Sequence, residues 1–128
     1  MNAARHAMEQ LQTWPGLTLG PASCGTGHAL RYAECEIVHF HSGRDADLHL
    51  TGRVIRTLGD QLGRSTAIRL LPQSQWVTVH LDHDRDADTL LGLVSLALRA
   101  HASCTDASAP PCNLNRITFP DRNDQYLQ

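Results

Sequence analysis

Hydrophobic and polar side chains alternate with a period of two between Glu36 and His41. Successive side chains of a strand point to opposite faces, so Val38 and Phe40 share one face while His39 and His41 share the other. The pattern predicts a strand with an apolar face for the core and a second face that carries histidines.

A second alternating stretch follows the turn residues Ser42–Asp45, with Leu48 and Leu50 separated by Asp47 and His49. This arrangement predicts a second strand and hence a hairpin. Burying each leucine beside the apolar face of the first strand is worth roughly 1.5–3 kcal/mol, and a one-residue slip would lose that burial. The favoured register therefore pairs the first histidine with an odd-numbered residue, and it places three imidazoles on one face: His39, His41 and His49.

Helical spacing predicts three helices around this hairpin. The first ends before Pro15 and has an apolar stripe of Ala4, Ala7, Met8, Leu11 and Trp14. The second has Thr51 as its N-cap, Gly63 at its end and a stripe of Val54, Ile55, Leu58 and Leu62. The last begins within Asp82–Asp88 and has a stripe of Ala87, Leu90, Leu91, Val94, Ala97, Leu98 and His101. Leu93 and Leu96 lie off that stripe, which favours packing against a second copy of the chain in a homodimer.

Short extended segments are predicted at 17–20, 28–33, 67–71 and 76–81. With the hairpin they define the fold class, a single α+β domain with a mostly antiparallel sheet flanked by about three helices. This domain is expected to occupy residues 1–102. Residues 103–128 are rich in Ser, Asp, Pro and Asn and have few apolar anchors, so we expect a partly ordered C-terminal tail.

Charge and composition exclude several classes of partner. The formal net charge is -2 and the basic residues form no run, so nucleic-acid binding is not expected. No apolar stretch approaches the roughly 20 residues that span a bilayer, and the N-terminus lacks the apolar segment of a secretory signal. We therefore expect a cytoplasmic protein that has no membrane partner.

The cysteines at positions 24, 35, 104 and 112 show no C-x-x-C spacing. In a cytoplasmic protein they are expected to be free thiols. Only Cys104 and Cys112 flank a loop-like segment that a bridge could close.

The histidine face can be interpreted in three ways. His39, His41 and His49 could bind a divalent metal ion, because neighbouring imidazoles on paired strands can form a facial set with positions open to substrate. The same residues could instead transfer protons without a metal, or they could be polar residues on a solvated sheet face. Asp47 is the nearest carboxylate for a fourth ligand or a catalytic role, whereas Glu36 is expected on the opposite face of its strand. No organic cofactor is expected.

The segment Asp82–Asp88 has the D-x-D-x-D beginning of a calcium loop. Ala87 stands where such a loop needs Gly, and Leu93 stands where it needs a bidentate Glu. Aspartates at a helix N-terminus satisfy free amides and suit the helix dipole, so we interpret this segment as a cap.

Several of the residues described above give the chain a resemblance to the luciferase-domain family, over about residues 8–101. The resemblance is carried by Glu36–His41, by Asp47–Leu50, by the helix with Val54 and Ile55, and by Gln75–Val79. The family includes small bacterial proteins similar to the domain of fungal luciferases. Fungal members oxidise an enolised pyrone with dioxygen and release carbon dioxide and light, without a recognised organic cofactor.

The resemblance implies a small enzyme of secondary metabolism that acts on an enolisable or oxidisable small molecule. Its residues would be His39, His41 and His49, with Asp47 as a further candidate. The alternative is a non-catalytic module that binds a small molecule or a protein, and nucleic-acid binding ranks third.

Overall fold

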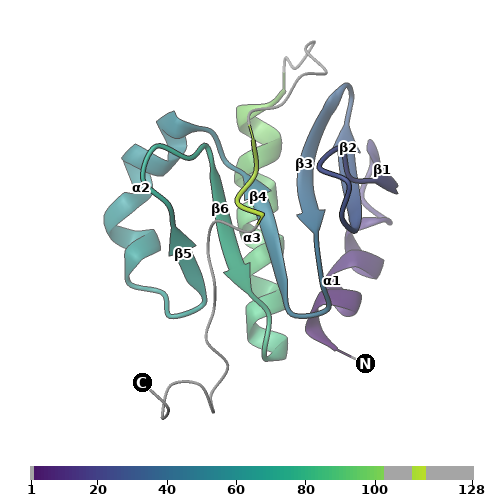
Figure 1. The fold of residues 1–128 in the computed structure, drawn as a ribbon, viewed down its shortest axis with the longest axis horizontal. Coiled ribbons are helices and arrows are strands. Elements are labelled where there is room, and N and C mark those ends of the chain that lie inside the picture. Colours follow the sequence, from purple (N-terminus) through teal and green to yellow (C-terminus); the bar gives the residue numbers. More distant parts are fainter. Residues whose placement is uncertain (1, 103–110, 115–128) are drawn as a thin grey trace.

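The structure is a computed structural model that describes residues 2–102 and 111–114. Its six-stranded sheet has the order β1-β2-β3-β4-β6-β5, and every neighbouring pair of strands is antiparallel (Figure 1). The elements in chain order are α1 (Ala3–Leu11), β1 (Leu17–Pro21), β2 (His28–Tyr32), β3 (Cys35–Phe40), β4 (Asp45–His49), α2 (Gly52–Gly63), β5 (Ile68–Leu70), β6 (Trp76–His80) and α3 (Asp84–Ala100). The predicted α+β class is confirmed.

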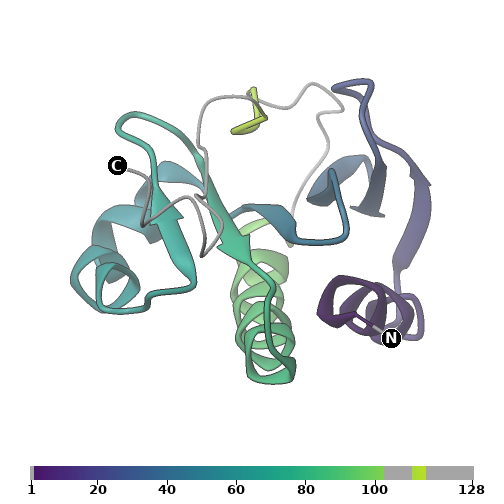
Figure 2. The ribbon, with the colours of Figure 1, turned by 60° about the horizontal axis from the view of Figure 1, so that its bottom comes forward.

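The helices α1 and α3 pack against each other on one face of the sheet, and α2 lies beside the edge strand β5. Figure 2 shows α1 and α3 below the sheet, with the short segment 111–114 above it. The segment therefore lies against the sheet face that the two helices leave uncovered. The other residues of the predicted tail lie outside the described residues.

The core face of the hairpin is the predicted one. Val38 pairs with Leu48 and His39 pairs with Asp47, so the predicted odd-numbered partner is confirmed. The four apolar side chains expected to share the buried face are all at most 4% exposed: Val38, Phe40, Leu48 and Leu50. They pack against the buried stripe of α3.

The opposite face of the sheet is also buried, which rules out the interpretation as a solvated sheet face. Every residue of β3 is buried, and so are Asp47, His49 and Trp76. The loop before β2 and the segment 111–114 contribute contacts over this face. The histidines consequently lie inside the protein.

A β-bulge in β3 corrects the expected position of Glu36. Leu30 pairs with Val38, but the next residue of β2, Arg31, pairs with Glu36, so Ile37 has no partner in the register. An extra residue shifts the alternation of the bulged strand by one position. Glu36 therefore shares a face with His39, and the expectation that it points to the opposite face is wrong.

The predicted helix ends agree with the structure. The Thr51 hydroxyl accepts a hydrogen bond from Val54 N at 3.4 Å, and α2 ends at Gly63. At the start of α3, Asp86 Oδ2 accepts hydrogen bonds from the amides of Asp82 and His83, both at 2.9 Å. Asp86 is thus the capping carboxylate that the sequence interpretation assigned to this segment.

A further expectation concerns the cysteines. Cys35 is disulfide-bonded, so the expectation of free thiols is wrong for Cys35. Cys24 and Cys112 are free.

Within residues 2–102 and 111–114, no helix is long and apolar enough to cross a membrane. Leu93 and Leu96 are half-buried against the core, and the homodimer stays a prediction.

Candidate metal centre

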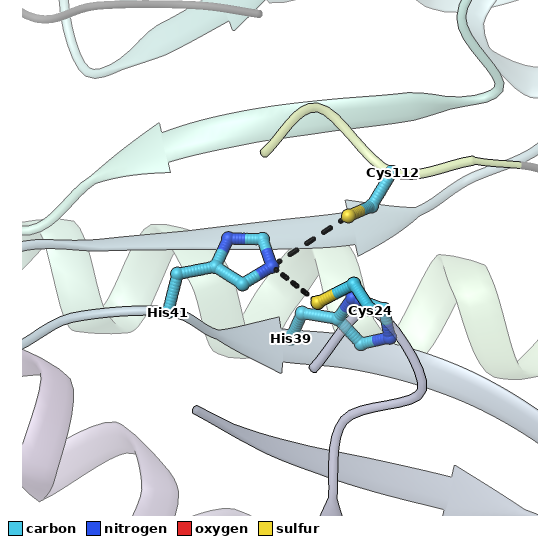
Figure 3. Close-up of side chains that lie close together, drawn as sticks. All are labelled: Cys24, His39, His41 and Cys112. Carbon is cyan, nitrogen blue, oxygen red and sulfur yellow. Dashed lines mark hydrogen bonds between the residues drawn. The ribbon is translucent and has the colours of Figure 1, made fainter. Parts of the chain in front are cut away.

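Two cysteines and two histidines come together on the sheet face opposite α1 and α3. One candidate ligand atom from each of Cys24, His39, His41 and Cys112 lies within 4.8 Å of the other three. Figure 3 shows the His41 ring directed at both thiols, with Nε2 3.3 Å from Cys24 Sγ and 3.6 Å from Cys112 Sγ. Nitrogen and sulfur ligands of a tetrahedral zinc ion are about 3.5 Å apart, given Zn–N near 2.0–2.1 Å and Zn–S near 2.3 Å. His41 Nε2 is therefore spaced from both thiols as a zinc site requires, and the remaining donor distances are all within 4.8 Å.

His39 has one ring nitrogen engaged and one available. Its Nε2 lies 2.7 Å from Glu36 Oε1, and its Nδ1 is buried without a hydrogen-bond partner. Burial would raise the pKa of Glu36, but hydrogen bonds from Ser23 and His39 outweigh it and lower the pKa. Burial lowers the pKa of His39, with partial opposition from Glu36. An ionised carboxylate only accepts, so Nε2 carries the proton of the neutral ring and the Nδ1 lone pair is the one open to a ligand.

His41 lies directly after β3. Its candidate ligand nitrogen is Nε2, whereas that of His39 is Nδ1. Its Nε2 faces the two thiols, while its Nδ1 lies 3.7 Å from Asp47 Oδ2. That distance is longer than a hydrogen bond, so Asp47 is an electrostatic neighbour of His41. Each histidine thus has a carboxylate on the side away from its candidate ligand nitrogen.

Cys24 reaches the centre because a glycine lets its loop approach β3 closely. Gly27 has φ +76, and a Cβ built there would lie 1.9 Å from Phe40 O. The amide of Ala22 donates to Gly27 O at 3.2 Å, and the amide of Ser23 donates to Glu36 Oε1 at 3.0 Å. A larger residue at position 27 would force the loop away from the end of β3.

Cys112 arrives on the segment Pro111–Leu114, which its neighbour Asn113 attaches to the sheet. The Asn113 amide donates to Asp47 Oδ2 at 2.7 Å, and Asn113 Nδ2 donates to Trp76 O and Thr78 Oγ1, both at 3.1 Å. Burial raises the pKa of Cys112 to about 11, and the proximity of Cys24 and Asp47 contributes in the same direction. Without a cation this thiol holds its proton, and a bound metal would displace it.

His49 lies on the predicted face but does not join the centre. It pairs with Trp76, and its ring stacks on the Trp76 indole with the centroids 4.8 Å apart and the planes 13° apart. The Trp76 indole also contacts His39, with the ring centroids 4.6 Å apart. Burial, reinforced by His101, lowers the pKa of His49 to about 4. Of the three predicted histidines, the structure brings His39 and His41 together in the centre, while His49 stacks on Trp76 outside it.

Sequence reasoning missed both sulfur donors. Cys24 and Cys112 are 88 positions apart and belong to no recognisable ligand motif. The one local signal is the glycine pair of Gly25-Thr-Gly27, which is typical of close backbone approach next to a cysteine. Nothing in the sequence indicates that Asn113 attaches its segment to the sheet.

The fold and the site define a single α+β domain with a candidate centre of two thiols and two imidazoles, two of the four residues being buried, on one sheet face. A family model for the luciferase domain matches residues 34–97, half of the chain, and the chain belongs to this family. The match contains Glu36, His39, His41 and Asp47, whereas both cysteines of the centre lie outside it. Searches of curated proteins and of solved structures found no match.

Proposed function

We propose that this protein is a metal-dependent enzyme that acts on an enolisable or oxidisable small molecule. The cation would be divalent, held by Cys24, His39, His41 and Cys112, and no organic cofactor would be needed. One observation carries the proposal: four donor atoms of the types that zinc prefers lie within 4.8 Å of one another.

The donor types narrow the choice of metal. Thiolate and imidazole ligands favour zinc and other borderline or soft cations over magnesium and calcium, which take oxygen ligands. Two of the donors are shielded, since His39 is 2% exposed and Cys112 is 8% exposed. Cys24 and His41 are only partly buried, so a zinc ion in this position would be shielded on one side and approachable from the other.

Catalysis requires a coordination position that substrate can reach. Catalytic zinc sites keep three protein ligands and one open position, while structural sites are closed by four. Cys24, His39 and His41 would form the three-ligand set. Cys112 would be the ligand that leaves the metal, because it lies on a segment that belongs to no helix or strand and that hydrogen bonds of Asn113 attach to the domain. A bound cation would supply Lewis acidity at the oxygen of an enolisable substrate.

The complete set of four donors also favours a second candidate, a non-catalytic module in which the metal stabilises the fold. In that case the four ligands would stay bound and no exogenous ligand could enter. The two candidates therefore differ in one measurable property, the accessibility of the metal.

The test starts with elemental analysis of protein purified without a histidine tag. We expect about one equivalent of zinc in the purified wild type and in His28→Ala, since His28 is exposed and outside the centre. The Cys24→Ser and His41→Ala variants should retain clearly less, because three remaining donors bind zinc more weakly than four. Replacing zinc by Co²⁺ should give the absorption of a cobalt ion with thiolate ligands. A change of that spectrum on adding azide supports the enzyme, and an unchanged spectrum supports the non-catalytic module. Metal-free protein that binds no added zinc would reject both.

A further inference from the structure

Two buried carboxylates lie beside the centre on neighbouring strands. Glu36 on β3 is 4% exposed and Asp47 on β4 is 1% exposed. Burying a carboxylate is costly unless hydrogen bonds or opposite charges compensate it. The partners of these two groups therefore indicate what each carboxylate is placed to do.

Glu36 contacts one histidine of the centre and the chain next to one cysteine. Its Oε1 accepts from His39 Nε2 at 2.7 Å and from the Ser23 amide at 3.0 Å, and its Oε2 accepts from Arg31 at 3.2 Å. Ser23 directly precedes Cys24. One carboxylate thus fixes the ring orientation of His39 and the loop that delivers Cys24.

Asp47 lies beside the other two ligands in a similar way, but its contact with the histidine is electrostatic and not a hydrogen bond. Its Oδ2 accepts from the Asn113 amide at 2.7 Å and lies 3.7 Å from His41 Nδ1, and its Oδ1 accepts from Thr78 Oγ1 at 2.6 Å. Asn113 directly follows Cys112. The second carboxylate is placed to hold the other half of the ligand set.

We propose that Glu36 and Asp47 are positioning residues that build the centre from two halves, Glu36 setting Cys24 with His39 and Asp47 setting Cys112 with His41. This inference rests on the proposed metal centre. The carboxylates also place negative charge beside the ligands, which a divalent cation would offset and which raises the basicity of the ligating histidines.

The first test replaces each carboxylate by its amide, in Glu36→Gln and Asp47→Asn. Loss of such partners of metal-ligating histidines typically weakens metal affinity by about ten- to a hundredfold. Zinc affinity of the full chain would be measured by competition with a chromophoric chelator. Glu34→Gln is the matched control, because it removes the same charge from an exposed position just before β3. Equal affinities in the Glu36→Gln variant and this control would overturn the role of Glu36, and equal affinities in Asp47→Asn and the control would overturn that of Asp47.

Double variants test the division into halves. Glu36→Gln should lose most of its effect in a Cys24→Ser background but act additively, within about twofold, with Cys112→Ser. Asp47→Asn should show the reverse pattern. Coupling of both carboxylates to both cysteines alike would overturn the two-half arrangement.

Two measurements separate positioning from a general loss of fold. The Co²⁺ spectrum should change in each carboxylate variant while the thermal unfolding of the metal-free protein keeps its cooperativity. If an amide variant fails to fold, Thr78→Val nearly preserves side-chain volume and removes the hydroxyl that donates to Asp47 Oδ1 and accepts from Asn113 Nδ2, the two contacts that attach the Cys112 segment through this strand. This variant should also weaken zinc binding in the Cys24→Ser background, and an unchanged affinity would count against Asp47. A wild-type protein without measurable zinc affinity would instead reject the metal centre itself.

Discussion

His39 Nε2 lies 2.7 Å from Glu36 Oε1, although residues three apart on a regular strand point to opposite faces. The bulge at Ile37 resolves this conflict by turning Glu36 onto the histidine face. The same carboxylate then reaches the Ser23 amide in the loop that carries Cys24. A single extra residue in β3 therefore determines which ring nitrogen of His39 is available to a metal.

Gly27→Ala should move the loop of Cys24 away from the centre. The substitution introduces a methyl group 1.9 Å from the position of Phe40 O and a residue at φ +76. We expect a clear loss of zinc affinity together with a lower melting temperature, both measured on the purified variant.

Gly25→Ala is the control for that experiment. Gly25 has φ +87, but a Cβ there meets no atom within 4 Å. It should therefore show only the backbone strain, about 1 kcal/mol, and retain zinc. If both variants bind zinc equally, close approach at Gly27 does not position Cys24.

Deleting residues 103–128 should separate folding from metal binding. The sheet, its helices and most of the apolar core precede this segment, so we still expect a cooperatively unfolding domain. The deletion removes Cys112 and the Asn113 contacts, so zinc affinity should fall at least as far as in Cys112→Ser. Zinc binding at wild-type affinity would show that Cys112 is not a ligand. Loss of cooperative unfolding would show that the segment belongs to the core.

The fold was predictable because each strand and helix has a local periodic signal. The alternation of Val38 and Phe40 with His39 predicts the hairpin register, and burial of Leu48 and Leu50 selects it. The helix caps at Thr51 and Asp86 follow from short-range hydrogen bonding, which sequence spacing also encodes. These features depend on contacts between residues that are close in the chain or paired across one turn.

The composition of the centre was not predictable because it depends on contacts between distant segments. The alternation placed His39 and His49 on one face, but it could not predict that the His49 ring stacks on Trp76 from a distant strand and stays out of the centre. Cys112 reaches the site through hydrogen bonds of Asn113 to another strand. The bulge that reorients Glu36 leaves no mark in the alternation, since Ile37 is a good strand residue in either register.

Phe40→Ala should destabilise the domain by about 3–5 kcal/mol, the usual cost of removing a core aromatic. Phe40 is 4% exposed and packs in the main core cluster. Urea unfolding of metal-free protein would measure the change, with Leu19→Ala as the control because Leu19 is 39% exposed. A Phe40→Ala variant as stable as the control would contradict the assigned core face.

Stability should fall as the pH is lowered from about 7 to about 4, and His49 should account for much of the loss. Burial and the neighbouring His101 lower the pKa of His49 from 6.5 to about 4. Between these values the unfolded chain binds a proton that the native state does not, so acidification favours unfolding. From about pH 7 to about pH 5 this single group should cost about 2 kcal/mol, and below its folded pKa the contribution levels off. His39 and His101, whose pKa values burial also lowers, act in the same direction.

His49→Phe isolates this contribution, because it removes the titrating ring and keeps an aromatic group against Trp76. Urea unfolding of metal-free protein would give the free energy of unfolding at about pH 7 and at about pH 5. The loss of this free energy between the two pH values should be about 2 kcal/mol smaller in the variant than in the wild type. His28→Gln should leave the difference unchanged, since His28 is exposed. An unaltered pH dependence in His49→Phe would mean that His49 has the same pKa in the native and unfolded states, so that burial against Trp76 does not shift it. At about pH 5 the Trp76 stack would then hold an imidazolium against the indole, which is a cation–π contact.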